Sequence, residues 1–236
     1  MTTPPVIGIL ETGRPPEELI AEHGDYPAMV MSWIGQAEGD YRLFAALDGM
    51  LPQSPSEADL WVITGSRFGA YEGHDWIAPL ERFIRACRDA GRPMMGICFG
   101  HQIIAQALGG VVRKSAKGWG LGIHDYAPVN WPDALGPAPE TLAIQAFHQD
   151  QIEELPAGAE RIAQSAFCEN AALWYPGFAL TVQGHPEFAT PFARALLEAR
   201  KGTVLVPAEV EAAQAGMDRG DTRADLARLI RDRLLP

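Results

Sequence analysis

A cysteine flanked by two glycines is the residue best placed to act as a nucleophile. In Gly-Ile-Cys-Phe-Gly, residues 96–100, apolar strand-like residues precede Cys98 and helix-like residues follow it. This is the sulfur counterpart of a nucleophile elbow, a strained strand-to-helix turn that lifts its central residue above the sheet edge. The helix N-terminus favours a thiolate at Cys98, and the N–H of Phe99 is a candidate oxyanion donor. The alternative is a buried cysteine packed in a tight turn.

A nucleophilic cysteine needs a general base, and His185 is the best candidate among six histidines. It follows the apolar run 178–183, and strand ends are where an α/β sheet carries its functional groups. Glu187, two residues later, can orient the imidazole and stabilise its charged form. Taken alone, His-Pro-Glu also fits a polar turn, and His148 is a rival base. The elbow and this segment together favour a Cys-His-Glu triad.

Two further strand ends carry groups that fit the same chemistry. Gly65 follows the apolar run 60–64, so its N–H is a candidate second oxyanion donor; the alternative is an ordinary exit from a strand. Phe147, His148, Gln149 and Asp150 end another predicted strand with hydrogen-bonding groups. No His, Cys and Asp residues have metal-ligand spacing, and no phosphate-binding loop pattern is present. Neither a metal nor another cofactor is predicted.

The alternation of short apolar runs and helical periodicity predicts the elements that position these residues. Crossover units around a parallel sheet are expected in the first half. In the second half, hairpins extend that sheet or form a small flanking one. The predicted strands are 6–10, 41–46, 60–64, 93–98, 111–113, 120–129, 142–147, 161–165, 172–175 and 178–183. The predicted helices are 26–36, 74–90, 100–108, 191–201, 208–215 and 223–235.

The charge and cysteine content of the chain indicate which classes of partner and which compartment to expect. The chain has 236 residues, with 19 basic and 30 acidic side chains and a net charge of −11. An acidic surface repels phosphate backbones and anionic lipids, so neither nucleic acid nor membrane is expected as a partner. Three cysteines, with no secretory start and no apolar run of membrane-spanning length, predict a cytoplasmic protein.

From about residue 7 to residue 197 the chain resembles the class I (triad-type) glutamine amidotransferase family. The resemblance is carried by Gly-Ile-Cys-Phe-Gly-His-Gln, by Ile-Thr-Gly-Ser and by Gln-Gly-His-Pro-Glu. It implies a flavodoxin-like α/β fold with a mostly parallel central sheet, flanking helices and a small antiparallel part. Residues 1–200 form that domain, and residues 201–236 form a helical C-terminal extension packed on it.

The resemblance also implies roles for individual residues. Cys98, His185 and Glu187 correspond to the catalytic triad, and Gly65 and Phe99 to the oxyanion hole. The predicted substrate-binding residues are Gln102, Phe147, His148, Gln149 and Asp150. A small γ-glutamyl compound such as glutamine is then the substrate. Apart from the resemblance, Arg67, Tyr71, Trp119 and Trp174 are candidates for an outer pocket wall.

Within the family, the chain resembles two branches, the amidotransferase part of GMP synthase and the stand-alone γ-glutamyl peptidase-like proteins. Only 49 residues follow Glu187, without a nucleotide-binding motif, so no acceptor chemistry is expected in this chain. The first hypothesis is a self-contained γ-glutamyl hydrolase that works through a thioester. The second is a glutaminase subunit that supplies ammonia to a separate synthetase. The third is a catalytically silent binding or regulatory homologue. Homodimerisation stays open.

Overall fold

A nine-stranded sheet with the order β2-β1-β3-β4-β11-β10-β9-β6-β7 runs through the computed structural model, which describes residues 4–236. Five neighbouring strands are parallel. They are β2 (Asp40–Phe44), β1 (Val6–Leu10), β3 (Leu60–Ile63), β4 (Met94–Ile97) and β11 (Ala179–Val182). The 2-1-3-4-5 order of this part is that of a flavodoxin-like sheet, so the predicted fold class is confirmed.

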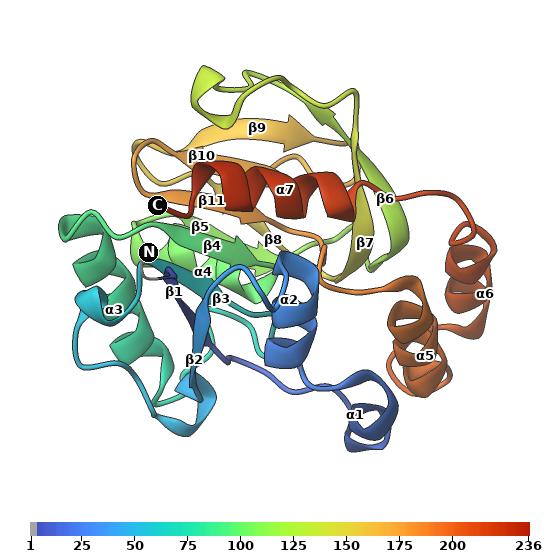
Figure 1. The fold of residues 1–236 in the computed structure, drawn as a ribbon. Coiled ribbons are helices and arrows are strands. Elements are labelled where there is room, and N and C mark those ends of the chain that lie inside the picture. Colours follow the sequence, from blue (N-terminus) through green and yellow to red (C-terminus); the bar gives the residue numbers. More distant parts are fainter. Residues whose placement is uncertain (1–3) are drawn as a thin grey trace.

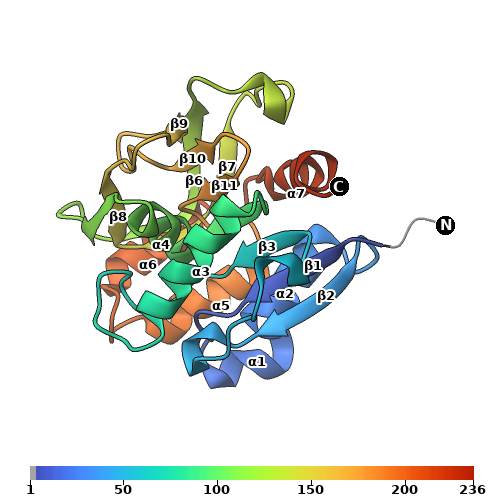
Figure 2. The ribbon, with the colours of Figure 1, turned by 90° about the vertical axis from the view of Figure 1, so that its left-hand side faces the viewer.

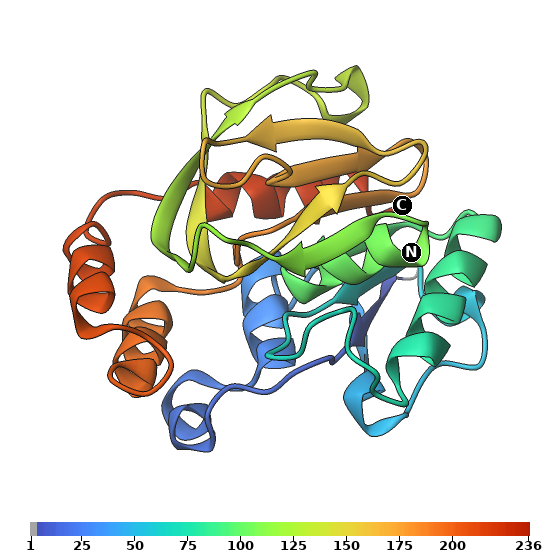
Figure 3. The same cartoon turned by 180° about the vertical axis from the view of Figure 1, so that it is seen from behind.

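The second half of the chain extends this sheet with antiparallel strands and also forms a separate small sheet. The added strands are β10 (Ala172–Tyr175), β9 (Glu160–Gln164), β6 (Gly120–Pro128) and β7 (Leu142–His148). The small sheet pairs β5 (Val111–Lys114) with β8 (Asp150–Glu154) and lies beside α4 (Phe99–Ala107) (Figure 3). The sequence left open whether the hairpins extend the main sheet or form a small flanking sheet, and the structure contains both arrangements.

Helices cover both faces of the parallel part, because its central strands are buried and apolar on both sides. On one face lie α2 (Tyr26–Ile34) and α7 (Arg223–Arg233), and on the other lie α3 (Ile77–Asp89) and α4 (Figure 2). The first face buries Ile9, Val62 and Met95, and the second buries Trp61 and Ile63.

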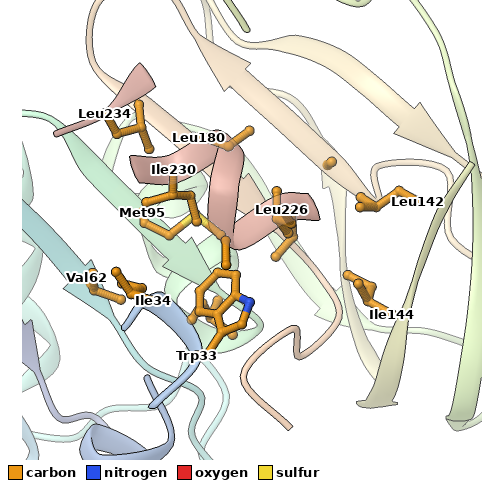
Figure 4. Packing of buried hydrophobic residues seen from close by; sticks show 14 of the residues in the cluster. Trp33, Ile34, Val62, Met95, Leu142, Ile144, Leu180, Leu226, Ile230 and Leu234 are labelled. Atoms are coloured by element: carbon orange, nitrogen blue, oxygen red, sulfur yellow. The ribbon is translucent and has the colours of Figure 1, made fainter. Parts of the chain in front are cut away.

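The C-terminal helix α7 is held on the sheet by a stripe of apolar side chains. Leu226, Ile230 and Leu234 recur every four residues and point toward Trp33 and the sheet (Figure 4). Each is at most 7% exposed, and burial of such a side chain contributes about 1.5–3 kcal/mol. Residues 223–234 are therefore an integral layer of the fold.

The remaining helices pack together beyond the end of the sheet, on the right of Figure 1. They are α1 (Glu17–His23), α5 (Thr190–Arg200) and α6 (Pro207–Ala215). Helix α5 contacts α1 and α6, and α6 also contacts β6. Short 3-10 turns at Ala46–Asp48, Pro55–Glu57 and Asp133–Leu135 complete the structure. Among the helices of the described residues, none has the length and hydrophobicity needed to cross a membrane.

Candidate active site

Cys98 occupies a strained turn between β4 and α4. Its φ angle is 50°, a left-handed conformation that is unusual for a residue with a side chain. Such strain persists where surrounding structure enforces it, and it clusters at functional sites. The glycines on either side make the turn feasible. A Cβ on Gly100 would lie 2.4 Å from the carbonyl oxygen of Ile63, and one on Gly96 would lie 2.7 Å from the carbonyl oxygen of Gly100.

His185 and Glu187 form a buried hydrogen-bonded pair on the loop after β11. The Nδ1–H of His185 donates to Oε1 of Glu187 at 2.8 Å. The His185 ring stacks on Phe188 with centroids 4.0 Å apart, and its backbone N–H donates to the carbonyl of Gln145 at 2.7 Å. The first two contacts orient the imidazole and the third holds its backbone, which leaves Nε2 of the ring for the pocket.

The Cys98 and His185 side chains line the same pocket, and the charges of the two groups interact. Burial alone would lower the pKa of His185, but the neighbouring Cys98 and Glu187 raise it to about 10. The imidazole therefore holds a proton at neutral pH. A thiol beside a charged imidazole that is oriented by a carboxylate is the arrangement of an activated nucleophile.

Gln183, which sequence reasoning had not placed in the site, joins Cys98 to Gln102. Its Nε2 donates toward the Cys98 sulfur at 3.7 Å, and its Oε1 accepts from Nε2 of Gln102 at 3.1 Å. The same Gln102 nitrogen donates to the carbonyl of Asp150 at 2.9 Å. Both amide hydrogens of Gln102 are thus used inside the protein, and only its Oε1 remains for a substrate. The sequence did contain a signal for this role, because Gln183 is the first residue of the Gln-Gly-His-Pro-Glu segment that also contains His185 and Glu187.

The backbone of Gly65 passes directly beside His185. A Cβ on Gly65 would lie 2.7 Å from Cε1 of the His185 ring, so only glycine fits there without displacing the imidazole. The carbonyl of Gly65 accepts a hydrogen bond from Oγ1 of Thr12 at 3.3 Å. Within residues 4–236, the N–H groups of Gly65 and Phe99 have no hydrogen-bond acceptor. Both donors are therefore available to an oxyanion.

The site includes one pocket of about 400 Å³, and Gly65, Phe99, Gln183 and Glu187 are not among the residues that line it. Cys98, His185 and Gln102 line it together with the predicted substrate-binding residues Phe147, His148, Gln149 and Asp150. The rival base His148 is buried without a carboxylate partner. Its Nδ1–H donates to the carbonyl of Asp150, and burial lowers its pKa to about 3, so it stays neutral. Within the described part of the chain, no three His, Cys, Asp or Glu side chains are grouped as metal ligands.

The outer wall of the pocket comes from distant parts of the chain. Arg67, Tyr71 and Trp119 line it as expected, but the expectation for Trp174 is wrong. Trp174 is in β10, where its side chain packs into the core on the α7 face. The pocket residues that the sequence did not predict include Arg14, Tyr26, Lys114, Phe188, Leu196, Arg200 and Val204. No local motif marks them, because tertiary packing brings them to the pocket.

Comparisons with known proteins show the family to which the chain belongs. The profile of the family described as glutamine amidotransferase class-I matches residues 66–200. Gamma-glutamyl peptidase 5 of Arabidopsis thaliana is 33% identical over 175 residues, which are 70% of this chain and 69% of that protein. A glutamine-hydrolyzing GMP synthase subunit of Methanospirillum hungatei is 32% identical over 114 residues, 44% of this chain and 60% of that protein. A glutamine amidotransferase structure from Thermotoga maritima has a TM-score of 0.74 at 23% identity and covers 99% of this chain and 97% of its own. This chain therefore belongs to the class I glutamine amidotransferase family.

Proposed function

We propose that the chain is a cysteine-dependent hydrolase that cleaves the γ-amide of glutamine or of a related γ-glutamyl compound. One observation carries the proposal: Cys98 and His185 line a single pocket, and His185 is hydrogen-bonded to the buried carboxylate of Glu187. The similarity to gamma-glutamyl peptidases supports the choice of bond. All three cysteines are free and buried, which is consistent with a reducing compartment.

In the first half-reaction, the Cys98 thiolate attacks the γ-carbonyl carbon and forms a C–S bond. The N–H groups of Gly65 and Phe99 hold the negative charge that develops on the carbonyl oxygen. His185 gives its proton to the leaving nitrogen as the C–N bond breaks, while Glu187 keeps the imidazole oriented. The products are a γ-glutamyl thioester on Cys98 and ammonia or a free amine.

In the second half-reaction, water hydrolyses the thioester. The neutral His185 takes a proton from the water as its oxygen attacks the thioester carbon. Collapse of the tetrahedral intermediate breaks the C–S bond, releases glutamate and restores the thiolate beside a protonated His185. The proton lost in the first step is thereby recovered, and one water is consumed for each amide cleaved.

The test measures glutamate and amine release by the purified chain acting alone on glutamine, γ-glutamyl amides and γ-glutamyl dipeptides. Cys98→Ala is expected to fold and to be inactive. Cys87→Ala is the matched control, because Cys87 is buried on α3, among apolar residues outside the pocket. Wild-type-like turnover by Cys98→Ala would contradict the proposal.

A second candidate is a glutaminase subunit that passes ammonia to a separate synthetase. The similarity to the glutamine-hydrolyzing GMP synthase subunit favours it. This candidate predicts low basal turnover that rises when the partner binds, in a protein whose Cys98 is still alkylated by a glutamine-analogue electrophile. A silent binding homologue, the third candidate, predicts neither turnover nor alkylation.

A further inference from the structure

Gln183 is a fully buried polar residue beside Cys98, and neither half-reaction uses it. Strand β11 runs parallel to β4, with Val182 opposite Ile97 at the end of the paired segment. The next residues are Gln183 after β11 and Cys98 after β4. The backbone N–H of Cys98 also donates to the carbonyl of Val182 at 2.9 Å. The register of the sheet therefore places the Gln183 amide next to the nucleophile.

The surrounding hydrogen bonds determine which end of the Gln183 amide faces the sulfur. The backbone carbonyl of Asp150 can only accept, so the Gln102 side chain turns its Nε2 toward that oxygen, at 2.9 Å. The other hydrogen of the same nitrogen goes to Oε1 of Gln183 at 3.1 Å. The opposite end of the Gln183 amide is Nε2, which lies 3.7 Å from the Cys98 sulfur. The sulfur therefore faces a hydrogen-bond donor.

The Gln183 amide is placed to serve the nucleophile and not the substrate. Cys98 and Gln102 line the pocket, whereas Gln183 is buried behind them and does not line it. A buried amide donor is costly to leave unpaired, and the contact with the Cys98 sulfur satisfies Nε2 of Gln183.

A donor at the sulfur favours the thiolate over the thiol, because a hydrogen bond to a charged acceptor is stronger than one to a neutral acceptor. In the first half-reaction this raises the fraction of Cys98 that can attack. In the second, the same donor stabilises the thiolate that leaves when the C–S bond of the thioester breaks. The amide keeps its hydrogens throughout, so no proton passes through Gln183.

Other groups also act on the Cys98 sulfur. The N-terminus of α4 contributes a partial positive charge, since Cys98 is the residue that precedes this helix. The titratable groups whose charges interact with Cys98 include His185 after β11, Tyr26 of α2, Tyr126 of β6 and Cys168 after β9. A substitution at Gln183 leaves all of these groups in the chain, so it isolates the contribution of the amide.

We propose that Gln183 is a catalytic residue that stabilises the Cys98 thiolate through its Nε2–H, and that Gln102 is a positioning residue that fixes the Gln183 amide. The inference rests on the proposed hydrolase function and adds a group that acts on its nucleophile. It also gives Gln102 a role that is exerted through Gln183.

The experiment measures the rate of Cys98 alkylation by iodoacetamide as a function of pH, with mass spectrometry to identify the modified residue, because the thiolate is the reactive form. Gln183→Met keeps an unbranched side chain of similar size without the donor. Its rate profile is expected to have a midpoint about one pH unit higher than that of the wild type, a tenfold change in the thiol–thiolate equilibrium. Gln102→Met moves the midpoint in the same direction. The double variant moves it no further than Gln183→Met alone, because Gln102 acts through Gln183.

Gln106→Met is the matched control. Gln106 lies one turn further along α4, where its Nε2 donates to the carbonyl of Ala70 at 2.7 Å and to Glu81 at 2.8 Å, and none of these three residues lines the pocket. This variant also loses a buried amide, but its midpoint stays at the wild-type value. Circular dichroism checks that each variant is folded, and Gln102→Met carries the test if Gln183→Met does not fold.

Two outcomes overturn the inference while the hydrolase function stands. One is a folded Gln183→Met, or Gln102→Met in its place, with the wild-type midpoint and Cys98-dependent hydrolysis. The other is an equal shift in Gln106→Met, which would make the effect a general consequence of losing an amide. The hydrolase function fails separately, if the wild type releases no glutamate from any γ-glutamyl substrate. The midpoints of the variants then still decide whether Gln183 stabilises the thiolate.

Discussion

The guanidinium of Arg223 donates its Nε–H to the backbone carbonyl of Pro186 at 2.8 Å. Its Nη2 donates to the carbonyl of Glu187 at 3.2 Å, and the carbonyl of Arg223 accepts from the Trp33 indole at 2.8 Å. The first residue of α7 therefore holds the loop on which His185 and Glu187 lie. The C-terminal helix α7 is thus joined both to the loop that carries His185 and to Trp33 of α2.

Arg223→Ala is expected to lower kcat about 10-fold or more with little change in KM, because the loop that orients His185 loses two hydrogen-bond donors. Arg231→Ala is the matched control. Arg231, on the same helix, donates to the carbonyl of Ile34 at 2.8 Å, and that contact is outside the pocket. Steady-state kinetics and urea unfolding of both variants are the measurements. If both variants lose the same stability and keep the wild-type kcat, Arg223 contributes to folding alone and the prediction is contradicted.

Glu187→Gln is expected to lower kcat by about 10²- to 10⁴-fold at neutral pH without abolishing turnover, since an unoriented imidazole still acts as a base. The carboxylate of Glu187 helps to raise the pKa of His185 to about 10. A raised pKa keeps His185 protonated up to that pH, so wild-type kcat falls only as the pH rises toward 10. In the variant this alkaline limb moves to lower pH. An unmoved limb in the kcat–pH profile would contradict the assigned pair.

Gly65→Ala is expected to reduce kcat/KM by at least 10-fold while the chain stays folded. The added methyl group would lie 2.7 Å from Cε1 of His185 and must displace the ring. Gly73→Ala serves as the control, because a Cβ at Gly73 meets no atom within 4 Å. Circular dichroism checks folding, and kinetics on one γ-glutamyl substrate measures the effect. Comparable activity of the two variants would contradict the prediction that a side chain at position 65 displaces His185.

His101 is expected to make the fold sensitive to acid. It is buried between Oγ1 of Thr181 at 2.7 Å and the carbonyl of Asn170 at 2.9 Å. Burial lowers its pKa to about 3, whereas the unfolded chain has an ordinary histidine near 6.5. The unfolded state binds the proton first, so stability is lost as the pH falls from about 6.5 toward 3.

The measurement for His101 is the free energy of unfolding in urea at several pH values between 7 and 4. In His101→Gln the decline of this free energy toward acid should be shallower than in the wild type. The absolute stability of the variant is not the readout, because the substitution also changes packing. A decline of equal slope in both proteins would contradict the assignment.

Much of the parallel sheet could be predicted because β1, β3 and β4 are continuous apolar runs between turn residues. Strand β8 could not, since its sequence Asp-Gln-Ile-Glu-Glu is mostly polar and it is a strand through its pairing with β5. Helix α1 has no buried residue and hence no apolar stripe to reveal it.

The inner site was open to prediction for a different reason. Cys98, His185 and Glu187 are in short motifs at strand ends, and the ends of parallel strands meet at one edge. The outer wall depends on packing between distant segments. Tyr26 and Arg200 reach the pocket only because α2 and α5 pack together around Phe188 and Phe192. The expectation that Trp174 lines the pocket was wrong for a related reason. The sequence of a strand does not show which face of the sheet an aromatic side chain occupies.

The most direct test of the central claim is the release of glutamate from γ-glutamyl amides by the purified chain, with Cys98→Ala and Cys87→Ala in parallel. The account predicts turnover by the wild type and by Cys87→Ala, none by Cys98→Ala, and a γ-glutamyl adduct on Cys98 when the reaction is quenched and analysed by mass spectrometry. Turnover that survives Cys98→Ala, or an adduct on another residue, would contradict it.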